Sequence, residues 1–431
     1  MHWAADEEAF TYHGGALEVA RRVAPQAPEP WIDLSTAINP HAYPLPHLEA
    51  EAWSRLPESG ALAGLEAAAA RRYRAEDGSV VAGPGSQALI HALAHILPRG
   101  AVGALGPTYG GFAGAFARMG EAKRLDDMGG LDVAIVVNPN NPDGRIVPRA
   151  ALLDLHERLA RRGGVLIVDE AFADFELLAP ESTQGPLQRV SSPTRAALAR
   201  ARAQALAGEE QGGGSRHPAS RGSSSRAFDN LLGPRDPPLI GRSEERPSIG
   251  RAMPAPTRGG GCANGVDPAQ MQLAPDSEES LAPMLPSRGA VVLRSFGKTY
   301  GLAGLRLGFA LASADIAKPL RAALGPWPVS GPAIAIGVRA LADSDWLEAT
   351  RGRLGKESAR LDMLLEGAGW RILGGTRLFR LASHDDARGA FERLLAAGIL
   401  ARPFAGERKR LRFGIPGDES AWERLATALQ G

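Results

Sequence analysis

Short apolar runs alternate with amphipathic stretches over most of this chain. The runs 132–138 (DVAIVVN), 165–170 (VLIVDE) and 290–296 (AVVLRSF) are almost continuously apolar, which is typical of parallel strands covered on both faces. Between the first two, the stretch ALLDLHERLARRG is predicted to be the crossover helix, with its apolar face formed by Leu152, Leu155 and Leu159. The alternation predicts an α/β fold with a mostly parallel sheet.

Beyond about Leu311 the pattern shifts to longer helices and then to short strands. The predicted helices are SGPAIAIGVRALAD and DWLEATRGRLGKESARLDMLLEGAG, and the strands lie near WRILGG, RLFRLA and RLRFGIP, with a helix at DARGAFERLLAAG. We therefore expect an N-terminal arm (1–40), a large domain (41–310) and a smaller C-terminal domain (311–431).

The segment 178–287 differs in composition from the rest of the large domain. It is rich in Gly, Pro, Ser and Arg, and only PTRAALARARAQALA is periodic within it. This composition predicts a disordered insertion. We favour a tolerated surface insertion over a regulatory or nucleic-acid-binding role for its arginines, because long loops cost little additional closure entropy.

Composition excludes several classes of protein. The formal net charge is +1, with 49 basic and 48 acidic residues, so nothing draws the whole chain towards nucleic acid or a membrane surface. The single cysteine, Cys262, can form neither an intramolecular disulfide nor a cysteine zinc site. The first residues are acidic where a signal peptide would be basic, and no apolar run approaches a membrane span. We expect a cytoplasmic protein without a metal site.

Polar residues gather where the predicted strands end, which is where open α/β sheets bind ligands. Gly83, Gly85 and Ser86 precede a helix whose free backbone amides could hold a phosphate, although a Gly-rich helix start is often only structural. Asn141 lies in the turn NPNNPDG directly after a strand, where its amide could hydrogen-bond a phenolic oxygen.

Asp169 and Glu170 end the strand VLIVDE. A buried carboxylate at such a position requires a cationic partner. A protonated pyridine nitrogen would satisfy this requirement, and a structural arginine would satisfy it equally well.

The stretch SFGKTYGLAGLRLGF combines Ser295, Lys298 and Arg306 just after a strand. A lysine in a partly apolar setting can lose its proton and form a Schiff base with an aldehyde. The serine and the arginine suit a phosphate, and Arg412 in RLRFGIP suits a carboxylate or phosphate. Taken singly, a solvated lysine and an exposed strand arginine are the commoner explanations.

Taken in chain order, GSQ, PTYGGF, NPNNPDG, VDEAF and SFGKTYGLAGLRLGF resemble the large domain of the fold type I aminotransferase superfamily. The resemblance is strongest to the histidinol-phosphate aminotransferase branch, and within it to the threonine-phosphate decarboxylases of cobalamin biosynthesis, because of HGG (13–15) and INP (38–40) near the N-terminus. It implies a mostly parallel seven-stranded sheet sandwiched by helices, a smaller α+β C-terminal domain, bound pyridoxal 5'-phosphate and a homodimer.

The resemblance also implies roles for individual residues. Lys298 would form the Schiff base, Asp169 would pair with the pyridinium nitrogen, Tyr109 would stack on the ring, and Asn141 would hold the ring oxygen. The cofactor phosphate would be held by Gly85, Ser86, Gln87, Ser295 and Arg306. Arg412 would bind the substrate carboxylate, and the substrate phosphate would be approached by His13, Gly14, Gly15 and Asn39.

Two positions depart from the branch's usual pattern. Phe172 stands where these aminotransferases have a tyrosine that bonds the ring oxygen, so one hydrogen bond to the cofactor is lost. Leu56-Pro57 stands where many relatives have a Tyr-Pro that reaches the neighbouring subunit's cofactor phosphate. That contact between subunits is therefore not expected here.

Three functions follow from the resemblance. The first is decarboxylation of L-threonine O-3-phosphate to (R)-1-amino-2-propanol O-2-phosphate. The second is transamination of histidinol phosphate or a related amino acid, with Arg412 holding the carboxylate in the ring plane. The third is a non-catalytic pyridoxal-binding regulator, although the stretch before Asp33 is too short for the winged-helix domain such regulators carry.

Overall fold

The computed structural model describes residues 7–98, 100–176, 279–285 and 288–430. All of these belong to one compact unit, 1–183 with 268–431, and a second unit, 184–267, lies outside the described residues. The helices are α1 Glu7–Tyr12, α2 Leu17–Val23, α3 Glu51–Ser54, α4 Ser59–Tyr73, α5 Ser86–Ile96, α6 Gly111–Ala115, α7 Arg149–Ala160, α9 Phe296–Thr299, α10 Ala314–Leu324, α11 Gly331–Ala342, α12 Ser344–Gly367, α13 Ala387–Ala396 and α14 Glu419–Gln430. The strands are β1 Ile32–Asp33, β2 Val80–Gly83, β3 Val102–Leu105, β4 Gly120–Ala122, β5 Val133–Val137, β6 Val165–Asp169, β7 Ala290–Ser295, β8 Gly308–Ala312, β9 Arg371–Thr376, β10 Phe379–Ser383, β11 Ile399–Leu400, β12 Arg402–Phe404 and β13 Glu407–Gly414.

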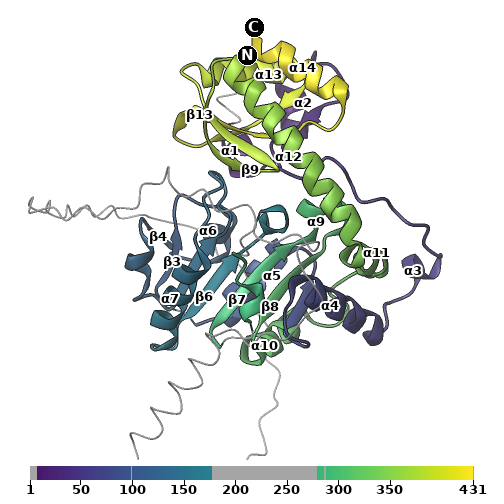
Figure 1. Ribbon diagram of the computed structural model, residues 1–431, viewed down its shortest axis with the longest axis vertical. Coiled ribbons are helices and arrows are strands. Elements are labelled where there is room, and N and C mark those ends of the chain that lie inside the picture. The colour runs from purple at the N-terminus through teal and green to yellow at the C-terminus, as the bar shows by residue number, and fades with distance from the viewer. Residues whose placement is uncertain (1–6, 99, 177–278, 286–287, 431) are drawn as a thin grey trace, which may run out of the picture. The chain divides into compact units, whose positions relative to one another are not determined.

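The largest sheet has seven strands in the order β2-β8-β7-β6-β5-β3-β4 (Figure 1). Strand β8 runs antiparallel to both of its neighbours, and the other pairs are parallel. The three predicted apolar strands are β5, β6 and β7, which lie side by side, so this prediction is confirmed. Their carboxyl ends therefore meet at one edge of the sheet.

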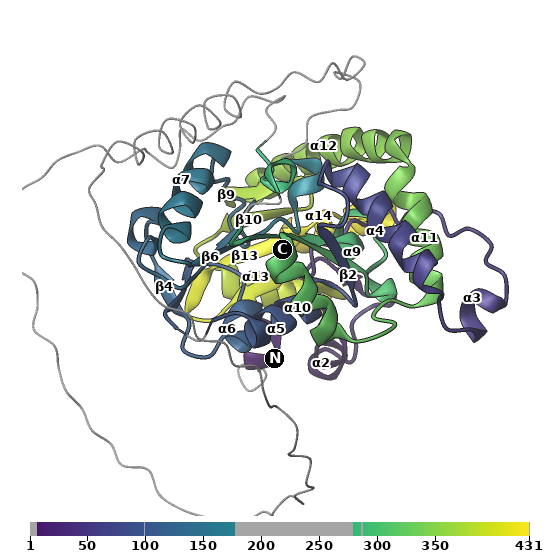
Figure 2. The same ribbon diagram turned by 90° about the horizontal axis from the view of Figure 1, so that it is seen from below.

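Helices cover both faces of this sheet (Figure 2). Alternate strand residues pack into two separate cores, as the period of two in a strand requires. One core joins the sheet to α4, α7 and α11, and the other joins it to α5, α6 and α10. This three-layer arrangement explains why the central strands are apolar at every position.

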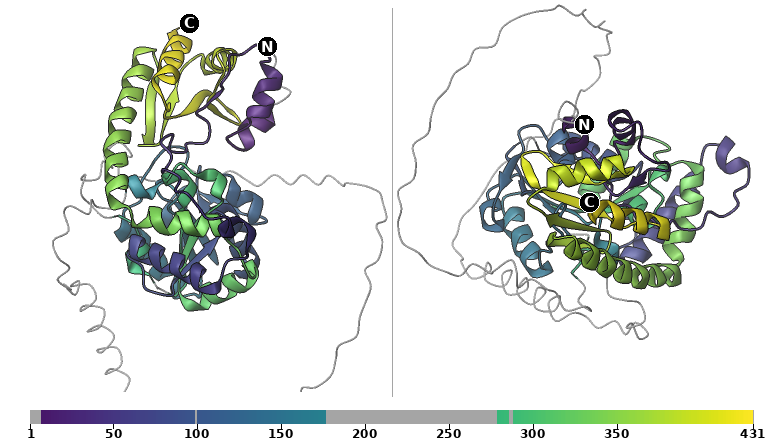
Figure 3. Two further views of the ribbon diagram at one scale, coloured as in Figure 1. Left: turned by 90° about the vertical axis from the view of Figure 1, so that its right-hand side faces the viewer. Right: turned by 90° about the horizontal axis from the view of Figure 1, so that it is seen from above.

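The C-terminal domain is built on an antiparallel sheet in the order β12-β13-β10-β9. Its core also contains Phe10, Ala20 and Leu34 from the other end of the chain. Strand β1 pairs in parallel with β11, and Figure 3 shows the purple N-terminal helices beside the yellow C-terminal elements. The N-terminal segment is therefore packed as part of this domain.

Packing shifts the predicted boundaries. Residues of α10 and α11 lie in the cores of the seven-stranded sheet, whereas Leu347 to Leu365 of α12 lie in the core of the C-terminal domain. We therefore place the boundary at the start of α12 and not at residue 311. The expected arm 1–40 is largely a component of the C-terminal domain, because its apolar residues pack there.

Most of the predicted insertion, 178–287, lies outside the described residues. Residues 279–285 are described, and Ser280, Leu281 and Ala282 are buried in the structure. The predicted end at Ser287 is thus too late, since these residues belong to the packed protein.

Candidate active site

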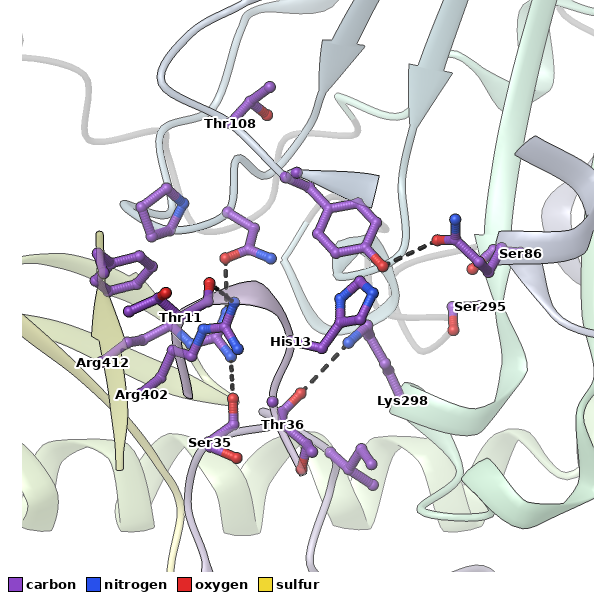
Figure 4. Close-up of a pocket in the computed structure, with 18 of the residues that line it drawn as sticks. Thr11, His13, Ser35, Thr36, Ser86, Thr108, Ser295, Lys298, Arg402 and Arg412 are labelled. Carbon is purple, nitrogen blue, oxygen red and sulfur yellow. Dashed lines mark hydrogen bonds between the residues drawn. The ribbon is translucent and has the colours of Figure 1, made fainter. Parts of the chain in front are cut away.

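A cavity of about 730 Å³ opens where the carboxyl ends of the central strands face the C-terminal domain (Figure 4). Eleven of the fourteen predicted site residues line it. They are His13, Gly14, Gly85, Ser86, Gln87, Tyr109, Asn141, Ser295, Lys298, Arg306 and Arg412. Gly15, Asn39 and Asp169 do not line the wall.

Lys298 is carried by α9, which begins directly after β7. Its Nζ donates to the carbonyl oxygen of Thr36 at 3.4 Å and lies 4.6 Å from the centroid of the Phe172 ring. Burial lowers the pKa of Lys298 to about 8, and the charges of Arg412 and Arg402 act in the same direction. A larger fraction of this amine is therefore unprotonated near neutral pH than in an exposed lysine, which favours its action as a nucleophile.

Asp169 ends β6 and is 4% exposed. Its Oδ1 accepts a hydrogen bond from the backbone N–H of Ala171 at 3.0 Å, and it forms no ion pair within the described chain. Burial raises the pKa of Asp169 to about 6, although the charge of Lys298 opposes the shift. A buried carboxylate in this state fits a cationic ligand group.

Glu170 pairs with a structural arginine, which is the second of the two cationic partners that the sequence analysis considered. Its carboxylate lies 2.9 Å from Nη2 of Arg294, and both side chains are fully buried. Glu170 also accepts hydrogen bonds from the hydroxyl of Ser280 and the backbone N–H of Leu281, at 2.7 and 2.8 Å. The two adjacent carboxylates thus differ, because Glu170 has a structural arginine and Asp169 has none.

The start of α5 forms an anion-binding cradle. Gly85 has φ of 88°, and no side chain caps the helix. A Cβ at Gly85 would lie 2.7 Å from Nη2 of Arg306, so only glycine allows this guanidinium so close. Ser86, Ser295 and Arg306 line the same part of the cavity. Free helix amides, hydroxyls and a guanidinium together suit a phosphate dianion.

Tyr109 lies between β3 and α6 and lines the cavity. Its hydroxyl donates to Oε1 of Gln87 at 2.9 Å, and its ring packs edge-on against Phe112. Gln87 also donates from Nε2 to the carbonyl of Gly111 at 3.4 Å. The side chain of Gln87 therefore contacts the hydroxyl of Tyr109 and also lines the cavity.

Arg412 crosses from β13 to the large domain. Its Nη1 donates to Oδ1 of Asn141 at 2.6 Å and its Nη2 donates to the carbonyl of Ser35, while Nε has no hydrogen-bond partner among the described residues. The side chain is buried, and its guanidinium lies 5.0 Å from the centroid of the Phe379 ring. Burial lowers the pKa of Arg412 to about 9, with the charge of Arg402 as a further cause.

Arg402, on β12, is a cavity residue that the sequence analysis missed. Its Nη2 donates to the carbonyl of Thr11 at 2.8 Å, but Nη1 is buried and has no hydrogen-bond partner in the part of the chain that the structure describes. Burial lowers its pKa to about 10. Within the described chain neither Arg402 nor Arg412 has a carboxylate at ion-pair distance. The spacing of Arg402 and Phe404 by two residues could have indicated one face of a strand. The sequence did not show which other strand this one pairs with.

The N-terminal segment contributes a turn beside these arginines. Oδ1 of Asp33 accepts hydrogen bonds from the backbone N–H and the hydroxyl of Ser35. The hydroxyl oxygen of Ser35 in turn accepts a hydrogen bond from the backbone N–H of Gly15 at 2.7 Å. Burial, followed by the charge of Arg402, lowers the pKa of His13. Gly15 thus orders the turn that carries His13 and Gly14, rather than lining the cavity itself.

The expected contact between Asn39 and a substrate is not supported. Asn39 is 2% exposed, and its Nδ2 donates to the carbonyl of Thr299 at 2.8 Å. Its Oδ1 accepts from the backbone N–H of His41 at 3.0 Å. The amide is fully committed to the backbone next to Lys298.

Two other kinds of site are not found within the described ranges. No group of three or more His, Cys, Asp or Glu side chains is placed to hold a metal ion there. None of the helices in these ranges combines the length and apolar character needed to cross a lipid bilayer.

Comparison with known proteins shows the family of this chain. Residues 12–199 and 261–429 match the family described as aminotransferase class I and II. The chain is 34% identical over 426 residues to a threonine-phosphate decarboxylase of Pseudomonas aeruginosa, covering 97% of each protein.

Solved structures share the fold. One is the histidinol-phosphate aminotransferase of Sinorhizobium meliloti in complex with pyridoxal-5'-phosphate, with a TM-score of 0.62, 15% identity and 96% and 93% of the two chains covered. Another is the L-threonine-O-3-phosphate decarboxylase of Porphyromonas gingivalis, with a TM-score of 0.53, 16% identity and 88% and 94% covered.

Proposed function

This chain belongs to the aminotransferase class I and II family, and on that premise we propose that it is a pyridoxal-phosphate-dependent decarboxylase of L-threonine O-3-phosphate. The products are carbon dioxide and (R)-1-amino-2-propanol O-2-phosphate, an intermediate of cobalamin biosynthesis. The relative named threonine-phosphate decarboxylase, similar over almost its full length, supports this function. The observation that carries it is a cavity lined by a buried lysine and by two arginines that have no carboxylate partner among the described residues.

The residues present fit the cofactor. The buried carboxylate of Asp169 has no ion pair within the described chain, which suits a pyridinium nitrogen. The cradle of Gly85, Ser86, Ser295 and Arg306 suits the cofactor phosphate. Tyr109 would lie against the cofactor ring. Because Oδ1 of Asn141 accepts a hydrogen bond from Arg412, its Nδ2 would be the atom that donates to the ring oxygen. When bound, pyridoxal phosphate supplies an electron sink for the bond broken at the substrate Cα.

The substrate carries a carboxylate and a phosphate. Arg402 and Arg412 supply two guanidinium groups at the same end of the cavity, and His13 lies between them and Lys298 in the view of Figure 4. We assign the substrate phosphate to this group of side chains. Ser86 and Ser295 of the cradle at α5 lie on the opposite side of the view. The cofactor phosphate and the substrate phosphate are therefore expected to bind at separate places.

Lys298 is the group that handles protons at Cα. Decarboxylation breaks the bond between Cα and the carboxylate carbon, carbon dioxide leaves, and one proton must be added to Cα. With its pKa lowered to about 8 by burial, Lys298 can carry that proton and release it near neutral pH. The apolar ring of Phe172 under its amine helps to exclude water from this step.

We also propose a homodimer. Several large apolar side chains are exposed, namely Leu45, Trp53, Leu56 and Trp327, at 66%, 69%, 66% and 55%. Exposed apolar residues of this size are typical of an interface between subunits. Light scattering after size-exclusion chromatography should give twice the chain mass, and a charged replacement, Trp53→Asp, should reduce it. The cytoplasmic location predicted from the sequence stays a prediction.

The function is tested with purified protein, pyridoxal phosphate and L-threonine phosphate. We expect carbon dioxide release without 2-oxoglutarate, and a visible absorbance band that is absent in Lys298→Ala. Consumption of the substrate that releases no carbon dioxide and strictly requires 2-oxoglutarate, with glutamate as a product, would assign the protein to the aminotransferases instead. A band that persists in Lys298→Ala would contradict the role of this lysine.

A further inference from the structure

Residues 36–43 lie alongside the turn that carries Lys298, although the two segments are far apart in sequence. The backbone N–H of Asn39 donates to the carbonyl of Lys298 at 3.0 Å, and that of Tyr43 donates to Tyr300 at 2.8 Å. The carbonyl of Thr36 accepts from the Lys298 amine itself at 3.4 Å. One short segment therefore contacts both the backbone and the side-chain end of this lysine.

The side chain of Asn39 adds a second hold on the same turn. Its Nδ2 donates to the carbonyl of Thr299 at 2.8 Å, while its Oδ1 accepts from the N–H of His41 at 3.0 Å. A donor is needed towards Thr299 and an acceptor towards His41; the amide of Asn39 supplies both, whereas the carboxylate of an aspartate of the same shape supplies acceptors only. Because the side chain is 2% exposed, neither partner is readily replaced by water.

The opposite side of the turn is fixed by Asp174. Its Oδ2 accepts from the hydroxyl of Thr299 at 2.5 Å, and its Oδ1 lies 3.5 Å from Arg294. All three side chains are buried. The peptide that follows Lys298 is thus held between Asp174 on one side and Asn39 on the other.

Gly301 makes the close approach of the two segments possible. It has φ of 65°, and a Cβ there would lie 2.7 Å from both the Cα of Ala42 and the carbonyl oxygen of Asn39. A side chain at this position would push residues 39–42 away from the lysine turn. The close contact between residues 39–42 and the lysine turn therefore depends on a glycine at position 301.

We propose that Asn39 is a positioning residue for Lys298: by bonding the carbonyls of Lys298 and Thr299 it fixes the turn so that the amine stands at the Thr36 carbonyl and at the cavity wall. The inference deepens the proposed function and rests on it for the role of Lys298. The physical reason for an effect is that a displacement of about 1 Å at a reacting group can cost roughly a hundredfold in rate.

The experiment compares Asn39→Asp, Asn39→Ala and the control His41→Ala. Asn39→Asp keeps an acceptor for the N–H of His41 but loses the donor to Thr299. His41→Ala breaks the contact of the same segment with Glu357, whose Oε2 lies 2.8 Å from His41 Nε2, and leaves the bonds to the lysine turn in place. Three quantities are measured: the rate at which apoenzyme is covalently trapped at Lys298 by pyridoxal phosphate and borohydride, kcat and KM per cofactor-loaded subunit, and the thermal unfolding midpoint.

We expect both Asn39 variants to slow covalent trapping and to lower kcat, roughly tenfold to a hundredfold, with KM changed less than about threefold. His41→Ala should lower the unfolding midpoint but leave trapping and kcat within about twofold. Asn39 variants that match the wild-type trapping rate and kcat would overturn the inference, and so would a His41→Ala enzyme that loses as much kcat as they do. A wild-type protein that traps no pyridoxal phosphate overturns the proposed function and this inference with it, whereas an active wild type with indifferent Asn39 variants overturns the inference alone.

Discussion

Arg402 and Arg412 are paired directly across the antiparallel strands β12 and β13, with their Cα atoms in register. Both side chains line the active-site cavity, and each has one buried nitrogen that lacks a hydrogen-bond partner within the described ranges. Like charges in opposed strand positions repel each other. The pair therefore favours the presence of an anion, which the proposed phosphorylated substrate supplies.

Replacing Arg402 tests this relationship. Arg402→Gln should raise the KM for L-threonine phosphate about tenfold to a hundredfold, because a hydrogen bond to a charged group contributes about 1.5–3 kcal/mol. The unliganded variant should also unfold at a higher temperature than the wild type, since the repulsion is removed. Inorganic phosphate should raise the wild-type unfolding midpoint more than that of the variant. Exposed Arg408, on the neighbouring strand β13, serves as the control through Arg408→Gln, and an unchanged KM in Arg402→Gln would rule out a substrate contact.

The pH dependence of cofactor capture should report the pKa of Lys298. Only the unprotonated amine reacts, so capture by apoenzyme should rise with pH around a midpoint near 8. Arg412 lowers this pKa and Asp169 raises it. Arg412→Met should consequently move the midpoint to higher pH, and Asp169→Asn should move it to lower pH. Stopped-flow absorbance at a series of pH values measures this, and shifts of the same sign in both variants would contradict the assignment.

Asp169 should cost the unliganded protein stability. Its pKa is raised from 3.8 to about 6, so between these values the folded chain holds a proton that the unfolded chain has released. Its contribution to stability therefore falls as pH rises through this window, by a total of about 2–3 kcal/mol. Asp169→Asn cannot ionise, and its Oδ1 can still accept from Ala171. Urea unfolding of the apoprotein should show the variant more stable at pH 7.5 and no such gain at pH 4, together with a loss of activity.

Arg294 should be indispensable to the fold. It is fully buried between Glu170 and Asp174, and its guanidinium also lies 4.6 Å from the centroid of the Tyr73 ring. Removing one member of such a buried network leaves an uncompensated charge and typically costs about 3–5 kcal/mol. Chemical denaturation of Arg294→Met should show a loss of this size. The double variant with Glu170→Gln should recover part of it, and a lack of any recovery would argue against the ion pair as the cause.

The sequence predicted those site residues whose position follows from a strand end. Asp169 and Lys298 each follow a continuously apolar run, and neighbouring parallel strands bring such ends together. The identity of the partner was not predictable. Glu170 and Asp169 are equivalent on paper, and only packing shows that Arg294 reaches one of them.

The position of Arg402 could not be predicted from the sequence. Its place opposite Arg412 depends on strand register, and the pairing of β12 with β13 shifts between Pro403 and Phe404. Register is set by the turn and by the packing of both strands. The domain boundary escaped for a similar reason, since the apolar face of α11 does not indicate which core receives it.

The pairing of Ile32 with Ile399 and of Asp33 with Leu400 joins segments that are far apart in the sequence. During synthesis on the ribosome, the segment around Phe10 and Leu34 must wait for its partners in the C-terminal domain, which are translated much later. Removing either segment would leave the same apolar core open. The two segments are therefore a single folding unit, which forms only after its later half has been translated.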